Sequence, residues 1–174
     1  SQLLELVDLA RTTPSSKNRQ PLKYLLITNE DEVKFIFSQL KWAWYLKEWA
    51  GPTNKEQSPA YIVMCIDTNL NDQAFIDVGI AAQTILLGAV EKQLGGCIIR
   101  TVNRFAISKH FNLPDNFDVV QVIAIGYPNQ DIELTTIDEN GSIEYYEDSK
   151  GTHYVPKRKL EDIIISPDRN NNKE

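Results

Sequence analysis

Hydrophobic and polar positions follow the periods of helices and strands over most of the chain. Apolar residues recur at helical spacing in four segments, which predicts helices at residues 3–10, 30–40, 73–94 and 103–113. Short apolar runs rich in strand-forming residues predict strands at 22–28, 60–67, 97–99 and 119–126. From residue 129 onward the pattern weakens, with an edge strand predicted at 143–147 and renewed structure at 155–165.

The segment 73–94 differs from the other predicted helices because its middle, residues 79–90, is apolar on almost every face. A helix of that kind is expected to be buried on all sides. Its small residues permit the close approach of another helix. A chain of this size has little other structure to cover such a helix, so we expect a homodimer.

Length and composition indicate a single globular domain. The chain has 174 residues, 42% of them hydrophobic, and 18 basic against 24 acidic residues give a net charge of −6. This charge argues against nucleic acid or a membrane as a partner. No signal peptide or long apolar run is visible, and two cysteines are too few for a disulfide scaffold. We therefore expect a cytoplasmic protein with Cys65 and Cys97 as buried, reduced thiols, a single domain over residues 1–166, and a frayed polar tail at 167–174.

The loop at residues 13–21 is the leading candidate for a binding site. Two prolines bracket a polar sequence, which excludes helix and strand. Its hydroxyl and amide side chains can donate and accept hydrogen bonds, and two cations accompany them. Such a loop suits a flat, heteroatom-rich ligand with anionic groups, and a well-bonded turn is the alternative. The polar residues in question are Ser15, Ser16, Lys17, Asn18, Arg19 and Gln20.

Gly95 and Gly96 follow the long apolar helix. One glycine commonly ends a helix, so a C-terminal cap is one interpretation. A second glycine lets the backbone approach a ligand closely, which is the other.

A dense basic cluster, Lys157-Arg158-Lys159, lies in an otherwise acidic region. It is either a solvated surface run or a seat for a phosphate group, since arginine pairs with phosphate oxygens through its planar guanidinium.

All three tryptophans, Trp42, Trp44 and Trp49, fall in one short stretch. The stretch is either an aromatic core cluster or a mobile wall over a flat ligand.

The sequence contains no metal-binding pattern, nucleophile elbow, phosphate-binding P-loop or dinucleotide fingerprint. No residue is assigned a catalytic role. A chain so poor in catalytic side chains is consistent with a bound cofactor that carries the chemistry.

Four separated stretches resemble the nitroreductase family. Residues 10–21, Ala-Arg-Thr-Thr-Pro-Ser-Ser-Lys-Asn-Arg-Gln-Pro, are similar to the flavin-contacting loop of that family. Residues 77–97 resemble its central helix and the Gly-Leu-Gly-Ser-Cys that follows. Residues 120–128 resemble the closing strand of the family, which commonly ends in Ile-Gly-Tyr-Pro. Residues 155–163 resemble the C-terminal motif of the family that contacts the phosphate.

The resemblance implies an α+β sandwich, with a central mixed or antiparallel sheet flanked by helices, in an intertwined homodimer. It implies one FMN at each subunit interface and NADH or NADPH as the electron donor. Hydride would pass through the flavin to a nitroaromatic, quinone or similar small-molecule acceptor in a ping-pong cycle. The implied cofactor-binding residues are Pro14, Ser15, Ser16, Asn18, Gln20, Leu94, Gly95, Gly96, Lys157 and Arg158, with Lys157 and Arg158 on the phosphate.

Two departures from the family pattern matter. Gln93 stands where the family has the first glycine of Gly-Leu-Gly-Ser-Cys. The Arg-Arg-Ser-x-Arg stretch that usually opens the family domain is not in this sequence, so its start is expected to be missing. Two alternatives remain: a flavin-binding or structural dimer without turnover, and a specialised flavin oxidase or dehalogenase on the same scaffold.

Overall fold

A computed structural model describes residues 1–49, 51–137 and 141–165 of the chain. The chain forms two compact units, each described by itself. The first consists of Ser1–Trp42 and Ala50–Pro128, and the second of Ala43–Trp49 and Asn129–Glu174. The expected single domain over residues 1–166 stays a prediction, and the tail at 167–174 lies outside the described residues.

The first unit is built on a four-stranded antiparallel sheet. Its strands are β1 (Leu22–Ile27), β2 (Ala60–Asp67), β3 (Gly95–Ile99) and β4 (Phe117–Gly126), in the order β1-β2-β4-β3. The two central strands, β2 and β4, are buried along most of their length, as expected for a continuous apolar run. All four strands expected in this part of the sequence are present.

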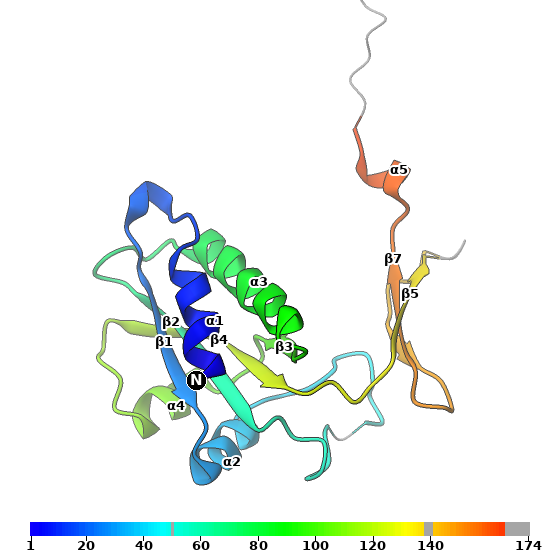
Figure 1. Cartoon of the computed structure of the whole chain (residues 1–174), viewed down its shortest axis with the longest axis horizontal. Coiled ribbons are helices and arrows are strands. Elements are labelled where there is room, and N and C mark those ends of the chain that lie inside the picture. The colour runs from blue at the N-terminus through cyan, green and yellow to red at the C-terminus, as the bar shows by residue number, and fades with distance from the viewer. Residues whose placement is uncertain (50, 138–140, 166–174) are drawn as a thin grey trace, which may run out of the picture. The chain divides into compact units, whose positions relative to one another are not determined.

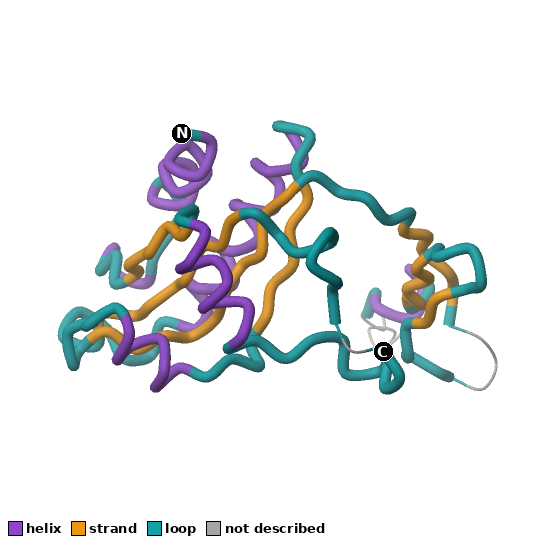
Figure 2. The backbone as a smooth tube through the Cα atoms, turned by 90° about the horizontal axis from the view of Figure 1, so that it is seen from below, coloured by secondary structure: helices purple, strands orange, loops and turns teal. Residues whose placement is uncertain are grey.

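Helices cover both faces of this sheet (Figures 1 and 2). On one face, α1 (Gln2–Arg11) and α3 (Phe75–Glu91) enclose a core with alternate residues of β2, such as Ile62 and Met64. On the other, α2 (Glu30–Ser38) and α4 (Arg104–His110) pack on Tyr61 and Val63. Successive strand residues point to opposite faces, so the one apolar run of β2 serves both cores. The predicted α+β sandwich is confirmed.

Within the protomer, α3 is buried on one side. Its small residues face inward, with Ala81, Ala82 and Ala89 buried, and a β-carbon at Gly88 would come within 2.7 Å of Leu9 of α1. The helix that approaches closely is therefore α1 of the same chain. The opposite stripe of α3 is exposed and apolar in the protomer, and its burial by a second subunit stays a prediction; its members are Ile76, Ile80, Leu87 and Val90.

The second unit is a small three-stranded sheet in the order β5-β7-β6. It contains β5 (Ile132–Thr136), β6 (Tyr146–Glu147), β7 (His153–Lys157) and the short α5 (Leu160–Ile163). β7 is parallel to β5 and antiparallel to β6, so the molecule contains both kinds of strand pairing. The predicted edge strand at 143–147 is reduced to its last two residues.

The cysteines and tryptophans are placed differently from what was expected. Cys65 is buried, and burial with nearby Asp118 raises the pKa of its thiol to about 12, but Cys97 is exposed, so the prediction of two buried thiols is wrong. Trp42 packs against Phe37, with ring centroids 5.7 Å apart. The side chains of Trp44 and Trp49 are exposed, so the three tryptophans do not form one core cluster. No helix among the described residues is long and apolar enough to cross a membrane.

Candidate functional site

The loop at residues 13–21 leaves the C-terminal end of α1 and leads into β1. The helix ends at Arg11, and Thr13 bonds back to it: its backbone N–H and its hydroxyl both donate to the carbonyl oxygen of Ala10, at 3.1 and 2.7 Å. Pro14 follows and cannot continue the helix. The next residues form one 3₁₀ turn, Ser16–Asn18, before Pro21 leads into the sheet.

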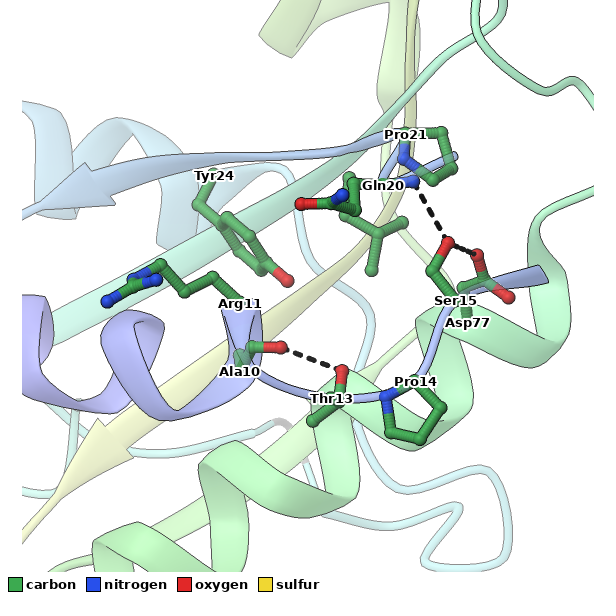
Figure 3. A pocket seen from close by; sticks show the side chains of 10 residues that line it. Ala10, Arg11, Thr13, Pro14, Ser15, Gln20, Pro21, Tyr24 and Asp77 are labelled. Atoms are coloured by element: carbon green, nitrogen blue, oxygen red, sulfur yellow. Dashed lines mark hydrogen bonds between the residues drawn. The ribbon is translucent and has the colours of Figure 1, made fainter. Parts of the chain in front are cut away.

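A cavity of about 150 Å³ lies beneath this loop (Figure 3). The loop, the end of α1, the first residues of β1 and the first turn of α3 all contribute to its wall. Of the residues predicted to bind a cofactor, three line it: Pro14, Ser15 and Gln20. The remaining lining residues are Ala10, Arg11, Thr13, Pro21, Leu22, Tyr24 and Asp77.

Tyr24 supplies a hydroxyl at the cavity from the strand side (Figure 3). Burial raises the pKa of this phenol to about 12, since the phenolate would be poorly solvated. The group is therefore a neutral hydroxyl at physiological pH, able to donate or accept a hydrogen bond.

Asp77 is the main site residue that the sequence reasoning missed. It lies in the first turn of α3 and is only 4% exposed. Its carboxylate accepts a hydrogen bond from the hydroxyl of Ser15 at 2.6 Å and another from the backbone N–H of Ser16 at 3.2 Å. The available sequence signal was a single acidic residue at the start of an otherwise apolar helix.

The outward side of the loop carries polar groups that are exposed. The hydroxyl of Ser16 makes no hydrogen bond to any described residue. The amide nitrogen of Gln20 donates to the carbonyl oxygen and to Oδ1 of Asn18, at 3.2 and 3.1 Å, which leaves the Asn18 NH₂ group unused among the described contacts. Lys17 and Arg19 are exposed and form no ion pair with described residues.

The region of Gly95 and Gly96 is a strand and not the helix end that was expected. α3 ends at Glu91, and both glycines lie in β3, paired with Gly126 and Ile125 of β4. A β-carbon at Gly96 would come within 2.6 Å of Leu86 and 3.1 Å of the Ala124 carbonyl oxygen. A side chain at Gly96 would force these neighbours to shift, so packing within this chain favours glycine there.

The other predicted cofactor-binding residues do not line the cavity under the loop. Leu94 is buried and lines a separate, mainly apolar cavity of about 210 Å³ with residues from the end of β4. Lys157 and Arg158 belong to the second unit, where Lys157 ends β7 and both side chains are exposed. Their assignment to a phosphate stays a prediction. Among the described residues, no three His, Cys, Asp or Glu side chains come together in a way that could hold a metal ion.

Comparisons of the sequence and of the structure with known proteins point to the same family. The sequence profile of the nitroreductase family matches residues 1–127. A nitroreductase family protein from Clostridium novyi NT is 26% identical, with 73% of each chain covered and a TM-score of 0.59. A Clostridium difficile R20291 structure described as an FMN-dependent nitroreductase is 24% identical over 74% of this chain and 75% of its own, with a TM-score of 0.60.

A longer match extends into the second unit. A Bacteroides thetaiotaomicron VPI-5482 protein, provisionally named NADH dehydrogenase/NAD(P)H nitroreductase, is 23% identical over 90% of this chain and 84% of its own, with a TM-score of 0.60. No curated protein sequence matches the chain.

Proposed function

The chain belongs to the nitroreductase family, and on that premise we propose that it is an FMN-dependent oxidoreductase that uses the loop at residues 13–21 to bind the flavin. The observation that carries the proposal is the loop itself. It lies within the matched region, and it presents free hydrogen-bonding groups next to a cavity.

The donor set of the loop fits the polar edge of a flavin ring, which offers ring nitrogens and carbonyl oxygens. The Ser16 hydroxyl and the Asn18 NH₂ group can donate to such acceptors, and both are exposed. Pro14 adds an apolar surface of the kind that a flat ring contacts. Lys17 and Arg19 give this edge a positive charge that suits an anionic ligand.

The remaining contacts are proposed by family analogy. The backbone of Leu94, Gly95 and Gly96 would face the flavin ring, and Lys157 with Arg158 would hold the phosphate. Arginine suits a phosphate because its planar guanidinium pairs with two oxygens at once.

Bound FMN would supply a two-electron carrier between NADH or NADPH and an acceptor such as a nitroaromatic or a quinone. The chain itself would bind and orient the ring, and the neutral hydroxyl of Tyr24 would be available to it as a hydrogen-bonding group at physiological pH. No side chain is assigned proton transfer.

We further propose that the protein is a homodimer in which a second copy covers the exposed stripe of α3. Ile76 is 77% exposed, Leu87 62% and Val90 68% in the protomer. Large apolar residues aligned on one face of a helix are typical of an interaction surface. By family analogy the flavin would lie at this interface, so the dimer and the cofactor should be lost together.

The test is a flavin titration followed by turnover. Purified full-length protein is mixed with FMN, freed of excess flavin by gel filtration, and its absorbance is recorded before and after NADH or NADPH. We expect co-eluting flavin that bleaches with the reductant and recovers its colour when a quinone is added. A protein that retains no flavin, or flavin that no nicotinamide reduces, would refute the proposal.

A further inference from the structure

The loop at residues 13–21 holds an unfavourable backbone conformation without any glycine. Lys17, Asn18 and Gln20 have φ values of 53°, 55° and 51°, in the left-handed region. Asparagine tolerates this region better than most residues, but lysine and glutamine do not. Such conformations persist where the surrounding structure holds them, and they concentrate at functional sites.

The group that holds the loop is Asp77. Among the described residues, it is the only side chain from elsewhere in the chain that forms a hydrogen bond with residues 13–20. It binds the loop twice, through the hydroxyl of Ser15 at 2.6 Å and the backbone N–H of Ser16 at 3.2 Å. The same Ser15 oxygen accepts the backbone N–H of Gln20 at 3.0 Å, so one carboxylate connects both ends of the turn (Figure 3).

The position of Asp77 makes these bonds strong. The residue is 4% exposed, so water competes little for its oxygens. It also lies in the first turn of α3, where the helix dipole favours a negative charge. Hydrogen bonds from neutral donors to a carboxylate are about twice as strong as those between neutral groups.

The arrangement also decides which atoms remain for a ligand. The Ser15 hydroxyl has given its hydrogen to Asp77, so it can act toward a ligand only as an acceptor. The neighbouring Ser16 is held by its backbone N–H, which leaves its hydroxyl free to donate. Asp77 therefore uses the Ser15 hydroxyl to anchor the loop and leaves the Ser16 hydroxyl for a ligand.

We propose that Asp77 is the positioning residue of the flavin loop: it holds residues 15–20 in the conformation that binds flavin, without touching the flavin. This inference rests on the proposed function for the identity of the ligand. The anchoring part of it concerns only this chain and can be measured with no flavin present.

Trypsin provides a readout of the loop in the flavin-free protein. The bonds after Lys17 and Arg19 are cleavable only when the loop opens locally, so their cleavage rate reports the open population. Asp77→Ala should raise that rate by roughly tenfold or more, as expected for the loss of a charge-assisted hydrogen bond. Cleavage after Lys150, in the other unit, should not change. Asp72→Asn is the matched control, because Asp72 is an exposed carboxylate close to the same helix start that forms no hydrogen bond to described residues.

Flavin titration then tests the positioning role. Asp77→Ala should weaken FMN binding by roughly tenfold to a hundredfold. Asp77→Asn keeps an acceptor oxygen and should lie between the wild type and the alanine variant in both assays. Ser15→Ala and Asp77→Ala both remove the Ser15–Asp77 hydrogen bond, so the double variant should lose less affinity than the sum of the two single variants.

The outcomes separate the two claims. A loop that is cleaved no faster in Asp77→Ala and Asp77→Asn overturns the anchoring role. Faster cleavage with unchanged FMN affinity overturns the positioning role. A wild-type protein that binds no FMN refutes the proposed function and with it the flavin part of this inference, while the cleavage rates still decide whether Asp77 anchors the loop. Faster cleavage and weaker FMN binding in Asp77→Ala, together with non-additive effects of Ser15→Ala and Asp77→Ala, support the proposal that Asp77 positions the loop.

Discussion

Replacing Gln93 by glycine should stabilise the protein. Gln93 follows the end of α3 with φ of 57°, in the left-handed region. Around it the backbone N–H of Leu94 donates to the Ala89 carbonyl at 2.8 Å, and that of Gln93 to the Val90 carbonyl at 2.9 Å. This pair of bonds is a Schellman motif, whose left-handed residue is usually glycine.

The size of the effect follows from two opposing terms. The left-handed conformation costs an L-residue about 1–2 kcal/mol. Glycine at the same place gives back about 0.4–1 kcal/mol, because its unfolded chain has more conformational freedom. Gln93 is exposed and its side chain forms no hydrogen bond with described residues, so nothing else is lost. The net gain is roughly 0.5–1 kcal/mol, or about 1–4 °C in Tm for a chain of this length.

Thermal and urea unfolding, followed by circular dichroism, measure this gain. Gln93→Ala is the control, since it removes the side chain but keeps a β-carbon in the left-handed position, and it should give no stabilisation. A glycine variant with an unchanged or lower Tm would refute the reasoning, as would an alanine variant that gains as much as glycine.

The remaining predictions concern the core, the dimer and the phosphate site. Tyr61 is fully buried and its hydroxyl has no hydrogen-bond partner among the described residues, so Tyr61→Phe should raise the free energy of unfolding by about 1–2 kcal/mol. Tyr154→Phe is the control and should give no such gain, because it removes a hydrogen bond to the carboxylate of Asp148. Burial raises the pKa of Tyr61 from 10.0 to about 12, so the free energy of unfolding of the wild type should be at its full value below pH 10 and should fall as the pH rises toward 12. Alkaline unfolding curves should show a smaller fall for Tyr61→Phe. Leu87→Asp, at an exposed position, should leave the protomer folded but reduce its sedimentation coefficient to that of a monomer and release FMN, and a variant that remains dimeric would contradict the proposed interface. Arg158→Ala should weaken FMN binding by about 1.5–3 kcal/mol in a titration of the apo-protein and Lys159→Ala far less, and equal affinities would mean that the basic cluster is a surface run.

The strands of the first unit could be predicted from sequence because each is a short apolar run between turn residues. Residues 60–67 were predicted with the bounds that β2 has in the structure. The helix starts predicted at residues 30 and 103 coincide with asparagine caps: Asn29 accepts hydrogen bonds from the N–H groups of Asp31 and Glu32, and Asn103 accepts one from Ala106. These features depend on neighbours in the sequence, which is why the pattern reveals them.

The features that were missed depend on contacts between distant residues. Asp77 meets Ser15 across 62 positions of sequence, and no local pattern predicts that pairing. Cys97 lies in an apolar sequence, yet its side chain is exposed on β3, the edge strand of the described four-stranded sheet. The end of α3 was placed too late because two glycines were available as a stop, whereas Gln93 takes the conformation that a glycine would have taken.

The long apolar helix shows why periodicity alone could not locate the dimer surface. When nearly every position is apolar, the hydrophobic pattern does not say which face packs on the protein's own sheet. Side-chain size carries that information here. The alanines pack inside the protomer, where α1 needs close approach, and the large residues Ile76, Leu87 and Val90 point outward. A charge at Ala82 or Ala89 would therefore disrupt the protomer's own core, so it could not separate loss of the dimer from unfolding. The exposed stripe is the position where that separation can be made, because a charge there is solvated in a monomer and costly only when a second copy covers it.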